Sequence, residues 1–457
     1  MTNNGDSPCG RSRYARAIAL RLWEAGHTTL FAGGYVRDTL LGMPTADIDI
    51  ATSATPDEIG RLFRRTIPVG VRFGVVIVVK GGIPFEVATF RRDVGTLDGR
   101  HPATVEFADA RADALRRDFT INGMFLDPRT GDILDYVDGE RDLRSGMVRA
   151  IGDPAQRFEE DWLRLLRAVR FAARFRFAFD EGTWSALCTR AEGIERISAE
   201  RIFQELTKML CGPHSDRALV LLHESGLLAR VLPEVEATVG VEQPPQFHPE
   251  GDVFTHTVLV LSHLDAPGAA LAWAALLHDI GKPATMTRSD RIRFNNHHRV
   301  GARMAAALLK RLRAPNALVG DVCAIIDNHM NFANVTRMRT STLKGFLARS
   351  TLEPELELHR ADCLASHGDL DNYYYVKKRG GEFRQEQLQP VPFLRGSDLL
   401  ELGLAPGPRL GAILQEAREL QLDEQLNDRE QALCWVRKRV AGDSGGGPGG
   451  CLTTKEI

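Results

Sequence analysis

Two neighbouring stretches decide the fold of the N-terminal part of the chain: LFAGGYVRD at residues 30–38 and ADIDIAT at residues 46–52. In the first, Gly33 and Gly34 stand between a run that predicts a strand and a run that predicts a helix. Glycines at such a turn let backbone N–H groups approach a triphosphate closely, and a helix N-terminus attracts negative charge. Arg37, one turn into the predicted helix, is a candidate for bidentate phosphate binding. A glycine pair by itself also fits an ordinary tight turn.

The second stretch adds a pair of acids. ADIDIAT alternates polar and apolar residues, so Asp47 and Asp49 project from one face of a predicted strand. Two carboxylates about 7 Å apart repel each other unless a cation lies between them, and Mg²⁺ binds such groups together with nucleotide phosphates. A third acid, Glu86 in IPFEVATF, lies on another predicted strand and is a candidate to complete the metal site or to accept a proton from an attacking hydroxyl. A bare Asp-x-Asp fits a solvated strand face, but the nearby glycine turn and arginine favour a nucleotide site.

The composition limits the function classes. The 457 residues predict about three compact units, and 43% apolar with 26% charged residues is a normal globular mixture. The formal net charge is only −2, so any nucleic-acid binding must come from a local basic face. The seven cysteines are scattered without metal-binding spacing, which suits reduced thiols. No apolar run approaches the roughly 20 residues that span a bilayer, and the polar start lacks a signal peptide, so we expect a cytoplasmic enzyme with no membrane contact.

Periodicity divides the chain into blocks. Short strand-like runs alternate with helical ones at first, the pattern then becomes helical, and QPPQFH at residues 243–248 interrupts it and predicts a domain boundary. The polar or glycine-rich ends are predicted to be disordered. The expected units are a disordered start at 1–13, an α/β head at 14–144, a helical neck and body at 145–242, a helical, histidine-rich domain at 243–441 and a disordered tail at 442–457.

Further motifs follow in order: RRDFTING at 116–123, EEDWLRLLRAVRF at 159–171 and SAERIFQELTKML at 198–210. Together with GGYVRD and DIDIAT, they resemble the class II nucleotidyltransferases of the polymerase-β superfamily, which include CCA-adding enzymes and bacterial poly(A) polymerases. Gly123 departs from the family motif, which has alanine there. The resemblance covers about residues 29–235. It implies an α/β head with a mixed, mostly antiparallel sheet, a helical neck and body, and Mg²⁺ at Asp47 and Asp49.

The resemblance also implies roles for residues after the head. Arg117 would contact the triphosphate, and Asn122 would shape the pocket. Helical i, i+3 spacing places Asp161, Arg164, Arg167 and Arg170 on one stripe of a predicted helix. A carboxylate accepts from the amino group that cytosine and adenine share, and a guanidinium donates to a ring nitrogen or carbonyl, so an Asp–Arg pair imitates a Watson–Crick edge and rejects G and U. The resemblance assigns base reading to Asp161 and Arg164, with Arg167 and Arg170 near the base or phosphates. Arg174 and Arg176 extend the positive face toward a bound RNA 3′ end.

The last block carries a spaced histidine and aspartate series: His256, the adjacent pair His278 and Asp279, and Asp362. Neutral imidazoles and carboxylates together suit a divalent transition metal. The series resembles the HD phosphohydrolase superfamily, in which His297 (or its neighbour His298) and His329 match the additional ligands of dinuclear members. This resemblance implies hydrolysis of phosphomonoesters or cyclic phosphodiesters. The block also fits a helical module that grips tRNA without activity.

The sequence thus predicts a mainly α protein with an α/β nucleotidyltransferase head and an all-α HD domain. The expected function is template-independent addition of CCA to the tRNA 3′ end from CTP and ATP. Residues 91–107 resemble the flexible loop of members that add all of CCA, although addition of CC alone stays open. Three competing functions also stay open: a poly(A) polymerase, an HD phosphohydrolase with a nucleotide-sensing head, and a non-catalytic RNA-binding protein. The oligomeric state stays open.

Overall fold

The computed structural model describes residues 8–45, 47–96, 102–246, 248–383, 388 and 390–442. Most of the two ends predicted to be disordered lies outside these residues. The prediction for 1–13 is wrong for its last part, because residues 8–13 belong to the first helix, α1 (Pro8–Glu24). That helix packs Ile18 and Leu22 into the core of the head, which stabilises the whole helix.

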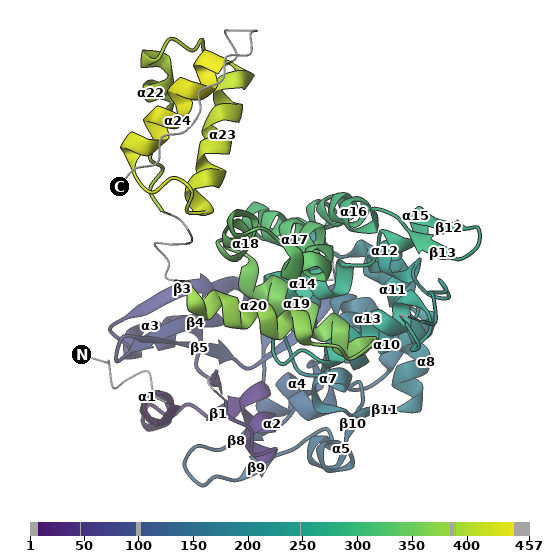
Figure 1. The fold of residues 1–457 in the computed structure, drawn as a ribbon. Helices are drawn as coiled ribbons and strands as arrows, with labels where there is room; N and C mark the ends of the chain where they lie inside the picture. The colour runs from purple at the N-terminus through teal and green to yellow at the C-terminus, as the bar shows by residue number, and fades with distance from the viewer. Residues whose placement is uncertain are drawn as a thin grey trace.

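The head contains a mixed seven-stranded sheet in the order β3-β4-β5-β2-β1-β8-β9, confirming the predicted mixed, mostly antiparallel sheet (Figure 1). Every pairing is antiparallel except β2 with β5. The strands are β1 (Thr29–Ala32), β2 (Asp49–Thr52), β3 (Thr66–Gly70), β4 (Val75–Lys80), β5 (Ile83–Thr89), β8 (Phe125–Leu126) and β9 (Ile133–Leu134). Around the sheet are α1, α2 (Gly34–Leu40), α3 (Pro56–Leu62), η1 (Val71–Phe73), the hairpin β6 (Arg91–Thr96) with β7 (Pro102–Phe107), α4 (Ala110–Leu115), η2 (Thr120–Asn122) and α5 (Gly139–Ser145), where η marks a 3₁₀ helix.

The two faces of the central strands differ sharply. Ile50 and Val87, which pair across β2 and β5, are buried in the same apolar core as α1. The residues one position earlier, Asp49 and Glu86, point to the opposite, exposed face. Strand alternation therefore creates an acidic face on the head.

Helices continue from the head through the neck and body into the HD domain. The neck and body contain β10 (Met147–Val148), α6 (Pro154–Glu160), α7 (Leu163–Phe175), β11 (Ala178–Phe179), α8 (Glu181–Thr189), η3 (Ala191–Arg196), α9 (Ala199–Leu210), α10 (Ser215–Glu224), α11 (Leu227–Val231) and α12 (Pro233–Glu236). A single apolar core runs on from these helices into the HD helices. At the junction Trp273 stacks on Phe203 with ring centroids 5.6 Å apart and donates to Thr207 Oγ1 at 3.0 Å.

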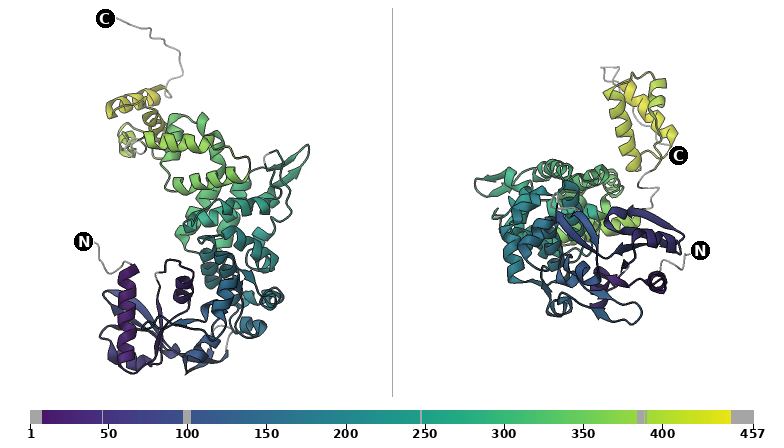
Figure 2. Two further views of the ribbon diagram at one scale, coloured as in Figure 1. Left: turned by 90° about the horizontal axis from the view of Figure 1, so that it is seen from below. Right: turned by 180° about the vertical axis from the view of Figure 1, so that it is seen from behind.

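The block predicted as one HD unit at 243–441 contains two further cores of its own. The HD helices are α13 (Val253–Ser262), α14 (Ala269–Leu277), α15 (Lys282–Thr285), the hairpin β12 (Met286–Arg288) with β13 (Ile292–Phe294), α16 (His297–Arg311), α17 (Asn316–Asn328), η4 (His329–Arg337), α18 (Thr340–Leu347), α19 (Leu352–Ala365) and α20 (Asp371–Glu382). The last core belongs to α22 (Gly396–Glu401), α23 (Pro408–Leu422) and α24 (Arg429–Gly442), which lie at the end of the molecule opposite the head (Figure 2). Among the described residues, no helix is long and apolar enough to span a membrane.

Candidate active sites

The glycine turn brings three predicted site residues together. Gly33 has a φ of 64°, in the left-handed region that favours glycine. A Cβ atom there would lie 2.9 Å from Arg117 Nη1 and 3.8 Å from Asp49 Oδ2. Gly33 therefore allows the turn, the arginine of RRDFTING and the second aspartate of DIDIAT to meet, as a nucleotide site requires.

Three carboxylates occupy the acidic face beside this turn. Asp47 precedes β2 rather than lying in it, but Ile48 is buried between the two aspartates, so Asp47 and Asp49 still share a face. Asp47 is almost fully exposed, and Arg11 of α1 approaches its carboxylate to 3.5 Å. Burial and the negative charge of Asp47 raise the pKa of Asp49, against the opposing effect of Arg117. Burial, followed by the charge of Asp49, raises the pKa of Glu86. An all-oxygen set of mutually repelling acids fits a hard divalent cation.

Arg37 lies under the glycine turn instead of beside it. Only 3% of it is exposed, and its guanidinium packs against two phenylalanine rings of α7. Its Nε and Nη2 pair with Asp38 at 2.8 and 2.7 Å, and its Nη1 donates to Asn122 Oδ1 at 2.5 Å. This geometry differs from the predicted bidentate phosphate contact, because the Asp38 carboxylate and the Asn122 amide already bind the guanidinium. Arg37 instead supports the turn that carries Gly34.

Arg117 and Asn122 are held by two buried acids that the sequence did not single out. Asp113 accepts from Arg117 Nε and Nη2 at 3.2 and 3.0 Å, and Arg117 Nη1 also donates to the backbone oxygen of Asn122. Asp118 accepts from Asn122 Nδ2 at 3.0 Å. Burial alone would raise the pKa of Asp118, but Arg167 and the hydrogen bond from Asn122 hold it well below its usual range. Asp118 lies within RRDFTING, and Asp113 lies just before this motif. Both acids bind arginines of the site and so orient them.

Three of the four residues predicted to share one helical stripe lie on α7. Arg164, Arg167 and Arg170 are half-buried on one side of α7, between fully buried neighbours. Asp161 is not on that helix, because α6 ends at Glu160 and Asp161 has extended φ and ψ of −149° and 100°. Its carboxylate accepts from the backbone N–H of Leu163 at 3.1 Å, and so stands at the entrance of α7.

Each residue of this row has a fixed partner that orients it. Four contacts serve this purpose: Asp161 with Arg201 Nη2 at 3.2 Å, Arg164 with Glu160 at 2.9 Å, Arg167 with Asp118 at 2.6 Å, and Arg170 with Glu205 at 2.7 Å. Arg201 and Glu205 come from α9, the ERxxxE helix. Packing α9 against α7 therefore orients Asp161 and Arg170, whereas α6 and the head orient Arg164 and Arg167.

A pocket of about 440 Å³ continues beyond the far end of this row. Its cations are Arg170, Arg174 and Lys208, and its apolar lining includes Met43, Met209 and Pro213. Met43 lies four residues before Asp47, and four residues span at most about 14 Å. The pocket that Met43 lines is therefore close to the acidic face. Arg176, the other cation expected on this face, is exposed at the C-terminal end of α7.

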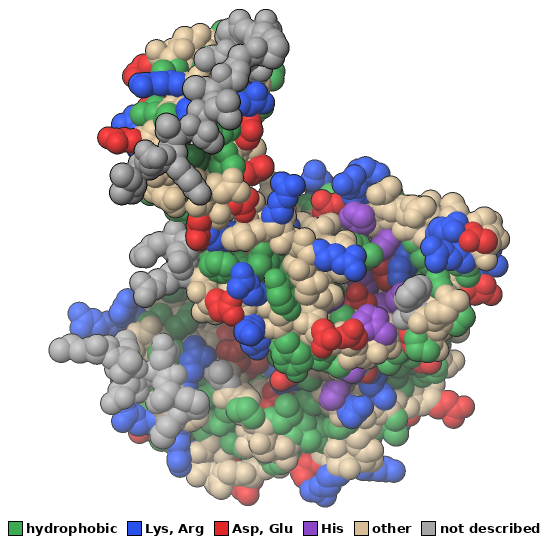
Figure 3. All heavy atoms as spheres, in the orientation of Figure 1, with side chains coloured by type: hydrophobic (Ala, Val, Ile, Leu, Met, Phe, Trp, Pro, Cys, Tyr) green, Lys and Arg blue, Asp and Glu red, His purple; other side chains and the backbone are tan. Residues whose placement is uncertain are grey.

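The second candidate site lies in the HD helices, where histidines gather on one face of the molecule (Figure 3). The structure brings His256, His278 and Asp362 together with all three ligand atoms within 4.8 Å of one another, and does the same for Asp279, His297 and His329. His256 Nε2 and His278 Nε2 are buried and make no hydrogen bond to any described residue. Buried imidazole nitrogens facing carboxylates without a hydrogen bond fit a divalent metal.

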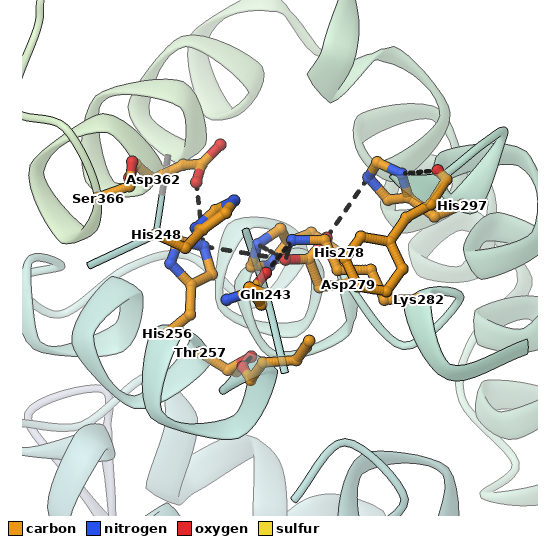
Figure 4. Close-up of polar contacts among 12 residues, drawn as sticks. Gln243, His248, His256, Thr257, His278, Asp279, Lys282, His297, Asp362 and Ser366 are labelled. Atoms are coloured by element: carbon orange, nitrogen blue, oxygen red, sulfur yellow. Dashed lines mark hydrogen bonds and ion pairs between the residues drawn. The ribbon is translucent and has the colours of Figure 1, made fainter. Parts of the chain in front are cut away.

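Asp279 connects the two ligand groups (Figure 4). Its Oδ2 lies 3.2 Å from His278 Nε2 and 3.9 Å from His256 Nε2, whereas its Oδ1 lies 3.5 Å from His297 Nε2. Burial and neighbouring histidines lower the pKa of His329 to about 3, so this ring is neutral and able to bind a metal. His297, rather than His298, faces the cluster, since its Nε2 lies 3.2 Å from His329 Nε2. Asp279 therefore lies between two groups of side chains, each of which could hold a metal ion.

HDIGKP at residues 278–283 carries His278 and Asp279 and directly follows helix α14, which ends at Leu277. A Cβ atom on Gly281 would collide with the backbone of His297, so glycine is needed for α16 to approach. Lys282 is 5% exposed and lies 2.6 Å from Asp279 Oδ2, inside the cluster.

Gln243, His248 and Glu250, at the predicted start of the HD unit, pack on the HD cluster. Gln243 Oε1 accepts from Lys282 Nζ at 2.6 Å. Glu250 Oε1 lies 2.6 Å from His256 Nδ1 and 2.9 Å from His248 Nδ1. Sequence reasoning missed these residues because a proline-rich stretch is typical of a linker. The signal that could have found them is a His and a Glu placed just ahead of His256.

Comparison with known proteins agrees with this arrangement. Models of the poly(A) polymerase head domain, of a probable RNA- and SrmB-binding site of polymerase A, and of the HD domain match residues 29–149, 176–238 and 253–366. A CCA-adding enzyme from Limosilactobacillus fermentum is 31% identical over 431 residues, covering 92% of this chain and 94% of the relative. The chain belongs to the CCA-adding enzyme family.

Solved structures show the CCA-adding enzyme fold over nearly the whole chain. The Bacillus stearothermophilus CCA-adding enzyme, solved in complex with CTP, superposes with a TM-score of 0.72 at 26% identity, covering 96% of this chain and 99% of that one. The Thermotoga maritima CCA-adding enzyme, solved with a tRNA, shares the fold with a TM-score of 0.58 at 19% identity, covering 94% and 95%.

Proposed function

We propose that the chain completes the 3′ end of tRNA by adding C, C and A from CTP and ATP without a template. The observation that carries the proposal is the meeting of Gly33, Arg117 and Asp49 in front of an oriented row of arginines. Membership of the CCA-adding enzyme family supports it. So do the CTP and tRNA bound by the B. stearothermophilus and T. maritima relatives.

In this proposal the tRNA 3′-hydroxyl attacks the α-phosphate of the nucleotide in line, and pyrophosphate leaves. Asp47 and Asp49 would hold Mg²⁺, which when bound would supply positive charge to activate the hydroxyl and stabilise the leaving pyrophosphate. Glu86, whose pKa is raised by burial and Asp49, lies beside these acids and accepts the hydroxyl proton or completes their metal site. Arg117, fixed by Asp113, and the backbone at Gly33 and Gly34 bind the triphosphate.

Base selection belongs to the start of α7. Asp161 accepts from the exocyclic amino group common to cytosine and adenine, while Arg164 donates to the ring acceptor beside it. Arg201 holds the Asp161 carboxylate from α9, so the acceptor keeps a fixed direction when the base changes from C to A. Arg167 and Arg170 stabilise the base or phosphates from the next turns of the helix.

The RNA end lies along the positive face that continues from this row. The pocket lined by Arg170, Arg174 and Lys208 offers cations for phosphates and apolar side chains for a nucleotide. It supplies the local basic surface that a chain with a net charge of −2 needs to bind RNA.

Addition of all three nucleotides, rather than CC alone, is part of the proposal. The segment expected to act as a flexible loop forms the β6–β7 hairpin, which follows β5 in the chain, and residues 97–101 of this segment lie outside the described residues. A poly(A) polymerase would use the same chemistry at the same carboxylates. The two differ in where extension stops.

We also propose a metal-dependent phosphohydrolase activity at the HD cluster. The two ligand groups on either side of Asp279 would hold divalent ions, which when bound would stabilise the charge that develops during hydrolysis of phosphomonoesters or cyclic phosphodiesters. Lys282 offers a further positive charge at the same place.

The two sites are separable by mutation. Asp47→Ala should abolish nucleotide addition and leave hydrolysis of a model phosphodiester intact, and His278→Ala should do the reverse. The measurement is both activities on each purified variant, with circular dichroism to confirm folding. A folded variant that loses both activities would contradict two independent sites.

A further inference from the structure

The segment ahead of the HD match covers the metal-ligand cluster. The HD model matches from residue 253, so Gln243, His248 and Glu250 precede it. Figure 4 shows Gln243 beside Lys282 and His248 beside His256 and Asp362. Glu250 contacts the candidate ligand His256 directly. His248 contacts Glu250, and Gln243 contacts Lys282, which pairs with the candidate ligand Asp279. The family match therefore leaves out part of what shapes this site.

Glu250 controls which nitrogen of His256 faces the cluster. His256 is fully buried, and its Nδ1 lies 2.6 Å from Glu250 Oε1. A carboxylate only accepts, so Nδ1 carries the proton that it donates to Glu250. The other nitrogen, Nε2, lies 3.0 Å from Asp362 Oδ1 without making a hydrogen bond. Its lone pair is thus aimed at the place where Asp362 and Asp279 also point.

His248 holds Glu250 in this position. Its Nδ1 lies 2.9 Å from the same carboxylate oxygen, and its ring packs edge-on against His256 with centroids 4.9 Å apart. Glu250 is 6% exposed at its side chain, and its second oxygen, Oε2, is buried without a hydrogen-bond partner among the described residues. Burying a carboxylate costs free energy unless a partner stabilises its negative charge. A carboxylate that accepts a hydrogen bond from a metal-ligating histidine has such a partner, and it makes the histidine a stronger ligand.

We propose that Glu250 is a positioning residue for metal binding at the HD cluster, orienting His256 as a ligand, and that His248 holds Glu250 in place. This inference rests on the proposed metal site. It adds that the proline-rich segment before α13 is a working part of the HD site.

The test is metal affinity of the full chain, freed of metal with a chelator and titrated calorimetrically with Ni²⁺ and with Mn²⁺. The binding step that disappears in His278→Ala identifies the HD site. Glu250→Ala should weaken that step about 10- to 100-fold, the usual cost of losing such a partner. Glu250→Gln should retain most of the affinity, because its amide oxygen still accepts from His256. His248→Ala should weaken binding less than Glu250→Ala.

Glu242→Ala is the matched control, since Glu242 is exposed and pairs with Arg288 on the surface. Nucleotide addition and the thermal unfolding midpoint report whether each variant is folded. Equal affinity in Glu250→Ala and Glu242→Ala would overturn the inference while leaving the metal site intact. Loss of a whole metal equivalent in Glu250→Ala would make Glu250 a ligand and also overturn the positioning role. Absence of the step in the parent protein would instead refute the proposed HD metal site.

Discussion

Asp118 accepts two hydrogen bonds from Arg167, from Nε at 2.8 Å and from Nη2 at 2.6 Å. The carboxylate belongs to RRDFTING in the head, and the arginine belongs to α7 in the neck. Asp118 also holds Asn122, which in turn accepts from Arg37 under the glycine turn. One buried acid therefore joins the arginine row to the triphosphate end of the site.

Asp118→Asn should destabilise the protein by about 1–3 kcal/mol, because it leaves the half-buried Arg167 guanidinium without its charged partner. The folded-state pKa of Asp118 is lowered, so its contribution is complete above the unfolded pKa of about 4 and is lost as the pH falls through the folded value. Urea unfolding at pH 7 and at lower pH measures the difference between variant and parent. We expect this difference to shrink only below about pH 4.

Glu140→Gln is the control for this experiment, since Glu140 makes a surface pair with Arg144. It should change the free energy of unfolding by less than about 0.5 kcal/mol. A difference between Asp118→Asn and the parent that grows on acidification would contradict the assigned role.

Gly33→Ala should impair nucleotide addition, and Gly42→Ala should not. Both glycines have a positive φ, 64° and 66°, so both substitutions cost about 1 kcal/mol of backbone strain. Only at Gly33 would the new Cβ press on Arg117, whereas nothing lies within 4 Å of the corresponding position at Gly42. Steady-state kinetics should show a KM raised equally for CTP and ATP in Gly33→Ala, since the triphosphate is common to both. Unchanged kinetic constants in Gly33→Ala would contradict a role of the glycine turn in triphosphate binding.

Arg201→Ala should relax base selection. Without Arg201 the Asp161 carboxylate is no longer fixed, and discrimination against UTP and GTP should fall by about 1–3 kcal/mol. The measurement is kcat/KM for CTP and UTP on a tRNA lacking its 3′ end. Arg230→Ala, which removes an exposed pair with Glu195, should leave the ratio unchanged. If Arg201→Ala lowers kcat/KM for CTP and UTP equally, Arg201 has a structural role and no role in base selection.

Metal removal should abolish both nucleotide addition and hydrolysis, and different metal ions should restore the two activities. Chelation followed by Mg²⁺ alone should restore nucleotide addition, because Asp47, Asp49 and Glu86 offer carboxylate oxygens. Hydrolysis should need a transition metal, because His256, His278, His297 and His329 supply imidazole ligands. Full hydrolysis with Mg²⁺ alone would contradict the assigned ligand set.

Strand alternation made the acidic face of the head predictable from the sequence. Alternating Asp and Ile in DIDIAT force the acids onto the face opposite the core, whatever the rest of the chain does. The HD ligands were also predictable as a set, and the structure brings all of them together. In both cases the pattern is local or carried by a family resemblance.

Long-range partners explain what could not be predicted. EEDWLRLLRAVRF has the pattern of one continuous helix, but Asp161 leaves it because Arg201, 40 residues later, and the N–H of Leu163 bind its carboxylate. Gln243 and Glu250 stand in a stretch with the pattern of a linker, and only the fold places Lys282 and His256 beside them. Arg37 similarly has a favourable position for phosphate, but Asp38 and Asn122 occupy its guanidinium.

The most direct test of nucleotide addition follows extension of a tRNA transcript that ends at the base before CCA, with Mg²⁺ and defined nucleotides. The proposed function predicts growth by two residues with CTP, by three with CTP and ATP together, then arrest, and none with GTP or UTP. Arrest after two residues when ATP is present would contradict complete CCA addition. A long A tail would indicate a poly(A) polymerase, and absence of any extension would refute the function proposed for the head.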